Sequence, residues 1–232
     1  MTFYKKPLIY PLGDAALVVS FGATLHERNN QLVRSLDIRL NQSPIFGVKE
    51  CVPAYNTLTI YYDPMSLSYD TVCHFVQSLA TGLEVEESQL TQEKIVPVWY
   101  NGPDLMDVVQ HTGLSIDEII AIHTSASYRV FMLGFVPGFP YLGGMDKRLA
   151  TPRKASPRMK IAAGSVGIAG EQTGIYPLDT PGGWQIIGQT PLRMFDMQQE
   201  DKPALLAMGD LLRFVSITED EFIHLKASGD GH

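Results

Sequence analysis

Glycine and proline recur every few positions after Tyr128, and this spacing leaves little room for helices. Short β-branched or aromatic segments lie between these turn residues. The segments are Tyr128–Phe135, Ser165–Ala169, Trp184–Gly188 and Leu211–Ser216. Closely spaced turn signals between short apolar runs are typical of a closed barrel of mostly antiparallel strands. The pattern therefore predicts a β-barrel for this part of the chain.

The first 90 residues have a different pattern, in which strands and helices alternate. The expected strands cover 8–10, 16–21, 48–53 and 58–62, and the expected helices cover 25–40 and 69–80. Thr24 with Glu27 forms a capping-box pattern before the first helix, and Ser68 is the expected N-cap of the second. This order predicts a small ferredoxin-like α/β layer of two helices on one antiparallel sheet.

A polar stretch, Glu84–Lys94, has the charge density of an exposed connection. It predicts two domains, an N-terminal α/β domain over 1–90 and a β-barrel domain over 91–232. The second domain is expected to begin with a strand at 95–100 and two short helices. Ser115 with Glu118 forms a capping box for the second of these helices. The predicted fold class is α+β with two domains.

Composition excludes several classes of protein. The formal net charge of −7 disfavours a nucleic-acid partner, and no apolar run reaches the roughly 18–20 residues that a membrane helix needs. Two separated cysteines and six histidines without a ligand spacing predict neither a disulfide framework nor a metal site. The N-terminus lacks a clean signal-peptide core, so a cytoplasmic location is expected. No phosphate-binding loop of the P-loop type is present.

One segment, Leu133–Gly144, contains four glycines, two prolines and three aromatic residues within twelve positions. Such a composition cannot form a regular helix or strand throughout, because proline fixes the backbone angle φ and glycine allows conformations that other residues avoid. The aromatic side chains of this segment would form a rigid apolar wall for a ligand. The candidate ligand-binding residues here are Phe135, Pro137, Phe139 and Tyr141. Equally, the segment could be a barrel corner whose aromatic side chains fill the core.

Six cations lie within fourteen residues of this acidic chain, at Lys147, Arg148, Arg153, Lys154, Arg158 and Lys160. Arginine suits two-pronged binding of carboxylate or phosphate, so Arg153 and Arg158 are candidates for holding an anionic ligand. The glycine-rich turn at Gly164–Gly170, with Ser165, would supply backbone or hydroxyl donors to the same anion. A solvated basic face that balances acidic surface elsewhere is the plainer alternative.

Two further residues allow two interpretations each. His123 ends an apolar helix face, where it is either a packed histidine or a proton-transfer group at the mouth of a site. Trp184 follows two glycines, and it either packs under a tight turn or stacks on a ligand. Gly183 and Gln172 are the remaining candidate ligand-binding residues.

Several strings, in this order and spacing, resemble one known family. They are GDAAL at 13–17, VPAYNTLTIYYDP at 52–64, VPVWYNGPDL at 96–105, LGFVPGFPYLGG at 133–144, PRKASPR at 152–158, AGSVGIAGEQTGIYP at 163–177 and TPGGWQIIGQTP at 180–191. The chain resembles the B subunits of 5-oxoprolinase, also called the allophanate-hydrolase-subunit-1-like or kinase-A-inhibitor family. The stretch 100–104 looks shorter than the corresponding glycine-rich segment of the family.

The resemblance implies a cyclophilin-like β-barrel as the second domain. It implies a hydrolase subunit, inactive alone, that takes part in ATP-dependent opening of 5-oxoproline to glutamate. ATP with magnesium would act at the level of a complex with the A and C subunits of 5-oxoprolinase. Inhibition of a sensor histidine kinase, or a role in an allophanate, urea-type or carboxyltransferase enzyme, are the alternatives. Without its partners the chain is expected to form homodimer contacts through an exposed partner surface.

Overall fold

The computed structural model of this protein describes residues 7–24, 26–83 and 93–228. The chain forms two compact units, Met1–Gln89 and Leu90–His232. The connection at 84–92, where the sequence predicts the domain boundary, lies outside the described residues, so the boundary between 90 and 91 stays a prediction. None of the described helices is long and apolar enough to cross a membrane.

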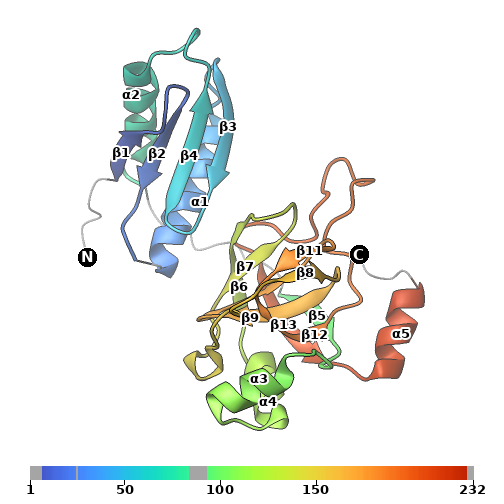
Figure 1. Ribbon diagram of the computed structural model, residues 1–232. Helices are drawn as coiled ribbons and strands as arrows, with labels where there is room; N and C mark the ends of the chain where they lie inside the picture. Colours follow the sequence, from blue (N-terminus) through green and yellow to red (C-terminus); the bar gives the residue numbers. More distant parts are fainter. Residues whose placement is uncertain (1–6, 25, 84–92, 229–232) are drawn as a thin grey trace. The chain divides into compact units, whose positions relative to one another are not determined.

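The smaller unit is a four-stranded antiparallel sheet with two helices on one face (Figure 1). Its strands are β1 (Leu8–Pro11), β2 (Ala16–Ser20), β3 (Val48–Pro53) and β4 (Thr57–Tyr62), in the order β1-β2-β4-β3. Its helices are α1 (Glu27–Gln42) and α2 (Tyr69–Ala80). Burial alternates along β4, because Leu58, Ile60 and Tyr62 are buried and the residues between them are not. This alternation explains why the helices pack on one face of the sheet.

The ends of these two helices test the capping patterns. Ser68 caps α2 as predicted, since its side chain accepts the N–H of Thr71. The predicted capping box at the start of α1 is wrong. His26 is the N-cap there, and its Nδ1 accepts the N–H of Arg28 at 3.1 Å. The mixed α/β character of the unit is established, and the ferredoxin-like label stays a prediction.

The larger unit is built on a seven-stranded sheet. Across the sheet the strands are β12 (Gln185–Gln189), β9 (Ser165–Ala169), β10 (Gln172–Ile175), β7 (Pro140–Gly143), β6 (Tyr128–Leu133), β13 (Leu211–Ser216) and β5 (Lys94–Val98). All neighbours are antiparallel except β13 and β5, which are parallel. A separate two-stranded sheet pairs β8 (Arg158–Ile161) with β11 (Thr180–Gly182).

The seven-stranded sheet curls until its two edge strands meet. Trp99 follows β5 and Gln189 ends β12, and the N–H of each donates to the carbonyl of the other at 2.9 Å. This isolated bridge joins the edges and makes the sheet a nearly closed barrel. The predicted barrel is therefore confirmed, and the more specific cyclophilin-like label stays a prediction.

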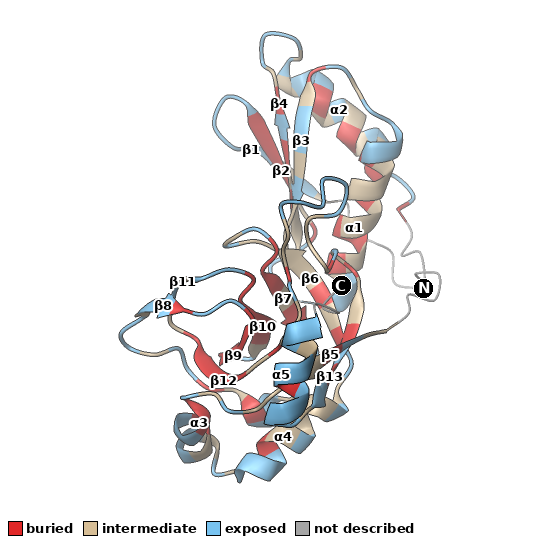
Figure 2. Ribbon diagram, turned by 90° about the vertical axis from the view of Figure 1, so that its right-hand side faces the viewer, coloured by how far each residue is buried: buried red, intermediate tan, exposed pale blue. Residues whose placement is uncertain are grey.

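The barrel interior is the hydrophobic core of the larger unit, as the red segments on its strands show in Figure 2. Helices α3 (Leu105–Thr112) and α4 (Ile116–Ser125) add apolar residues to this core, whereas most of α5 (Glu219–Ser228) is exposed. The predicted capping box at the start of α4 is present. A short 3-10 turn, Lys147–Leu149, opens the basic segment of the sequence.

Candidate functional site

Five of the six cations in the basic segment are held in ion pairs. The pairs are Lys147 with Glu171, Arg148 with Asp146, Lys154 with Asp104 and Asp107, Arg158 with Asp104, and Lys160 with Asp179. Arg153 is exposed, and no carboxylate partner exists for it in the part of the chain that the structure describes. The basic segment is thus largely neutralised from within the protein, and Arg153 is its one member without an ion pair among the described residues.

Asp104 organises the loop that carries Arg153. Its carboxylate is 1% exposed and accepts hydrogen bonds from Arg158 Nη1 at 2.7 Å, Lys154 Nζ at 2.8 Å and the N–H of Ile186 at 2.7 Å. A second bond from Arg158 makes that pair two-pronged. Burial raises the pKa of Asp104, but the bonds from Arg158, Lys154 and Ile186 hold it below its ordinary value.

This geometry corrects the expectation for Arg158. Its guanidinium is committed to Asp104 through two hydrogen bonds, so it fixes the loop instead of facing a ligand. The loop is fixed a second time where the N–H of Lys154 donates to the carbonyl of Gly183 at 2.7 Å. Arg153 therefore sits on a backbone that is held on its C-terminal side.

A depression of about 630 Å³ lies between this loop and helix α3. Arg153, Lys154 and Gln185 line it, together with Thr151 and His111 among others. Lys154 is neutralised by Asp104 and Asp107, so Arg153 carries the uncompensated charge of the depression. Such a site favours a small anion that also offers hydrogen-bonding groups.

The predicted aromatic wall exists as a cluster around Phe139. The ring centroid of Phe139 lies 5.7 Å from that of Phe135, 5.0 Å from Tyr141, 5.1 Å from Tyr176 and 5.3 Å from Trp184. Phe139 and Trp184 are buried, which matches the core-packing alternative for both. Three of the five rings, those of Phe139, Tyr176 and Trp184, are thus buried in the core instead of facing a ligand.

The charge of Arg153 affects the pKa of two tyrosines in this cluster. Burial raises the pKa of Tyr176 to about 12, while the N–H of Trp184 and the charge of Arg153 act in the opposite direction. Burial also raises the pKa of Tyr141, again opposed by Arg153. Both phenols are protonated at neutral pH. The charge of Arg153 thus acts on two tyrosines of the cluster, of which Tyr141 belongs to the predicted wall.

Phe135 is the exposed member of the cluster and has an unusual backbone. It is 60% exposed, and its φ of 67° is the single positive value among the described residues other than glycine. A bulky side chain in this region costs free energy and occurs where the surrounding structure enforces it. Pro137 lies in the same loop and lines a small hollow with Phe135. The structure places these two predicted residues at the surface.

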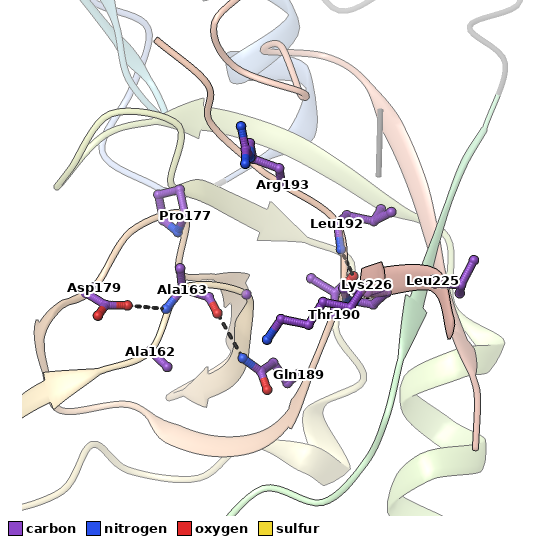
Figure 3. A pocket seen from close by; sticks show the side chains of 12 residues that line it. Ala162, Ala163, Pro177, Asp179, Gln189, Thr190, Leu192, Arg193, Leu225 and Lys226 are labelled. Carbon is purple, nitrogen blue, oxygen red and sulfur yellow. Dashed lines mark hydrogen bonds between the residues drawn. The ribbon is translucent and has the colours of Figure 1, made fainter. Parts of the chain in front are cut away.

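The glycine turn at Gly164 does not offer its donors to an anion. The N–H of Gly164 donates to the carbonyl of Tyr176 at 2.7 Å, and the N–H of Ser165 donates to that of Ala162 at 3.2 Å. Gly164 lines a separate hollow of about 530 Å³ (Figure 3), in which Asp179 accepts the N–H of Ala163. The predicted backbone anion site at this turn is therefore corrected, since both N–H groups are used within the barrel.

Backbone hydrogen bonds position Gln172 and Gly183, and among the described residues that of Gly183 reaches the loop of Arg153. Gln172 begins β10 and pairs with Ala169, while Gly170 between them forms a bridge with Thr151. Gly183 contributes its carbonyl to the loop, as described above. The carbonyl of Gly183 thus helps to hold the loop of Arg153, whereas the backbone of Gln172 pairs within the barrel sheet.

His123 is a packed core residue. It is 0% exposed, stacks on Phe214 at 4.4 Å between ring centroids, and uses both ring nitrogens. The Thr173 hydroxyl donates to the carbonyl of Gly167, so it accepts from His123 Nε2, and Tyr100 donates to Nδ1 at 2.7 Å. Burial lowers the pKa of His123 to about 3. This position matches the packed-histidine interpretation and does not support proton transfer at the mouth of a site.

The buried neutral His123 predicts a loss of stability in mild acid. Its pKa rises on unfolding from about 3 towards an ordinary value of about 6.5, so the unfolded chain takes up a proton between these values. Stability from this residue is complete above pH 6.5 and decreases by about 1.4 kcal/mol for each pH unit below it. Urea unfolding at pH 7 and 5 will show this slope. A His123→Gln variant with the same slope would contradict it.

Sequence reasoning missed three residues of this region. Asp104 lies within one of the strings that carry the resemblance, but the string gives no sign of its partners, which lie about 50 residues away. Tyr176 and Gln185 also lie in such strings without being singled out. The pairing of cations with distant carboxylates was the missing information. Within the described residues, no group of three or more histidine, cysteine, aspartate or glutamate side chains could hold a metal ion.

Comparison with known proteins places these features in a family. The family model described as carboxyltransferase domain, subdomain C and D, matches residues 7–206. The 5-oxoprolinase B subunit of Bacillus subtilis (strain 168) is 44% identical over 231 residues, which cover 92% of this chain and 94% of that protein. The 5-oxoprolinase B subunit of Escherichia coli O157:H7 is 41% identical over 217 residues, which cover 91% of this chain and 96% of that protein.

A solved structure, that of TTHA0988, has a similar fold. It superposes with a TM-score of 0.79 at 37% sequence identity, and the match covers 87% of this chain and 40% of that one. This chain thus spans less than half of the length of TTHA0988. The match supports the mixed α/β architecture with its nearly closed barrel.

Proposed function

This chain belongs to the family of the carboxyltransferase domain, subdomain C and D, and we propose that it is the B subunit of a bacterial ATP-dependent 5-oxoprolinase. The observation that carries the proposal is the identity of 44% with a 5-oxoprolinase B subunit over nearly the full length of both chains. The reaction opens the ring of 5-oxoproline to give glutamate. The chain would act with the A and C subunits in the cytoplasm and be inactive alone, as the resemblance implies.

Within this complex we assign anion binding to Arg153. It is the cation of the basic segment without an internal carboxylate partner among the described residues, and its charge opposes the rise in the pKa of Tyr141 and of Tyr176. Opening an unstrained lactam is slow because resonance stabilises the amide, so ATP is needed to activate it. Such phosphoryl transfer depends mainly on positioning and on cations around the reacting groups. Arg153 would supply one such cation and orient the substrate.

The described residues of this chain fit an anion better than a complete nucleotide site. The glycine turn uses its N–H groups internally, and no group of three or more histidine, cysteine, aspartate or glutamate side chains that could hold a metal ion occurs in the described part of the chain. ATP with magnesium is accordingly proposed at the level of the complex. When bound, it supplies the phosphoryl group that activates the lactam oxygen.

Omission of single subunits tests this function. ATP-dependent formation of glutamate from 5-oxoproline should require the complete set of three subunits. Turnover should fall to the background level when this chain is left out, and return when it is added back. Full turnover without it would contradict the proposal and leave kinase inhibition as the function to test.

A further inference from the structure

Phe135 is the central residue of a three-residue turn in the loop between β6 and β7 (Figure 1). The N–H of Val136 donates to the carbonyl of Gly134 at 2.8 Å, and the φ of Phe135 between them is 67°. A hydrogen bond from the third residue to the first, with a positive φ between them, is the mark of the rarer and strained form of the γ-turn. The strained position is thus occupied by a bulky residue.

A second turn and a bond across the base of the loop hold this conformation. Pro137 and Gly138, whose φ is 80°, take the central positions of a type II turn, which the N–H of Phe139 closes by donating to the carbonyl before Pro137 at 3.1 Å. The N–H of Gly134 donates to the carbonyl of Phe139 at 3.1 Å. Since the side chain of Phe139 is buried, the loop is also attached to the core. The backbone of Phe135 is therefore fixed from both sides.

This fixed backbone presents the phenyl ring of Phe135 at the surface. The residue is 60% exposed, and its ring contacts the buried ring of Phe139 edge to face, with 5.7 Å between the centroids. Glycine would adopt the same φ without strain, so the backbone alone does not require phenylalanine here. Strained residues persist where the surrounding structure enforces them, and they cluster at sites of binding and catalysis. The ring is therefore expected to contact another molecule.

The hollow beside the ring indicates a protein as that molecule. It has a volume of about 310 Å³ and is lined by Leu133–Gly138, whose side chains carry neither a charge nor a hydrogen-bonding group. 5-Oxoproline and ATP are both anions, so this uncharged hollow suits neither of them. It suits an apolar side chain of another protein. Exposed aromatic rings held in one position are typical of the few residues that dominate binding at protein interfaces.

The size of a related protein indicates which protein covers the ring. This chain corresponds to 40% of TTHA0988, so the same fold occurs there as one part of a longer polypeptide. A chain that works as a separate subunit has to bind its companion through side chains that are exposed when it is alone. Phe135 meets this requirement, and its rigid loop reduces the entropy that is lost on binding.

We propose that Phe135 is an anchor residue by which this chain binds a companion subunit of the 5-oxoprolinase complex. The ring enters an apolar pocket of that subunit, and an apolar side chain of the subunit fills the hollow beside Pro137. This inference rests on the proposed function and adds a contact through which the complex assembles.

The test compares binding with stability, using calorimetric titration of the chain with the A and C subunits in turn and urea unfolding of the chain alone. Phe135→Gly and Phe135→Ala both remove the ring, so each should weaken binding to the companion subunit at least about tenfold, the equivalent of about 1.4 kcal/mol. Phe135→Ala keeps a β-carbon at the positive φ and should unfold at a lower urea concentration than Phe135→Gly. Ile223→Ala is the matched control, since Ile223 is 58% exposed on α5, and it should keep the affinity of the wild type.

Four results would overturn the inference. The first is wild-type affinity of Phe135→Gly for the companion subunit. The second is an equal loss of affinity in Ile223→Ala, which would make the effect one of apolar surface in general. The third is a Phe135→Ala variant more stable than Phe135→Gly, because the turn would then hold no strain. The fourth is a wild-type chain that binds neither subunit, a measurement that needs no variant to fold.

These results are distinguishable from failure of the proposed function. If any of them occurs while omission of the chain still abolishes turnover, the anchor role of Phe135 is wrong and the proposed function stands. If turnover does not require the chain, the proposed function itself fails.

Discussion

Arg153→Ala is expected to lower kcat/KM for 5-oxoproline in the assembled complex by about 10- to 100-fold. A hydrogen-bonded charge pair with a ligand contributes about 1.5–3 kcal/mol, and that is the free energy the variant loses. Arg153 is exposed and has no carboxylate partner among the described residues, so the free energy of unfolding should change by less than about 0.5 kcal/mol. Steady-state kinetics of the complex and urea unfolding of the chain measure the two quantities.

Lys160→Ala is the matched control for this prediction. Lys160 belongs to the same basic segment, has a side chain that is 72% exposed, and pairs with Asp179 at the surface. Its removal changes the net charge by the same amount and should leave kcat/KM unaltered. If the two variants behave alike, the effect is one of overall charge, and the anion-binding role of Arg153 is wrong.

The contrast between Arg153 and its neighbours shows where sequence reasoning reached its limit. The count of six cations was correct, and so was the alternative that most of them balance acidic groups. The sequence does not reveal which of the six cations lacks a carboxylate partner, because Asp104 is about 50 residues from Lys154 and Arg158. Such pairs arise only when the segment that carries Lys154 and Arg158 meets the start of α3 in the folded unit, as the ion pairs with Asp104 show. The number of charges in a sequence does not show which of them lie close together in the fold.

Local signals predicted the fold better than the site. The barrel followed from the spacing of turn residues, and the N-caps Ser68 and Ser115 followed from short-range rules. His26 is the N-cap of α1. Its ring nitrogen accepts a backbone N–H, as the hydroxyl oxygen of serine or threonine does at other N-caps. Phe139 and Trp184 were ambiguous because an aromatic residue in a glycine-rich turn fits a core or a ligand equally. Burial decides between the two, and burial is a property of the assembled barrel.

Asp104→Ala is expected to reduce the free energy of unfolding of the larger unit by about 3 kcal/mol. The substitution leaves Arg158, Lys154 and the N–H of Ile186 without their common acceptor, and removing one partner of a buried ion pair typically costs about 3–5 kcal/mol. The lower figure applies because the side chains of Arg158 and Lys154 are partly exposed and water can replace some of the interaction. Fluorescence during urea unfolding reports this unit, because both tryptophans, Trp99 and Trp184, lie in it.

The loss of stability caused by Asp104→Ala should depend on pH. The pKa of Asp104 is lower in the folded protein than in the unfolded chain, so its contribution is complete above about pH 4 and disappears as the pH falls through the folded value. The difference between wild type and Asp104→Ala should therefore be constant from pH 7 to 5 and shrink below 4. Asp107→Ala is the control, since this carboxylate is 53% exposed and Lys154 is its one ion-pair partner among the described residues, and a loss of under about 1 kcal/mol is expected. Equal losses in the two variants would show that Asp104 does not organise the loop. In that case the fixed position of Arg153 would need another cause.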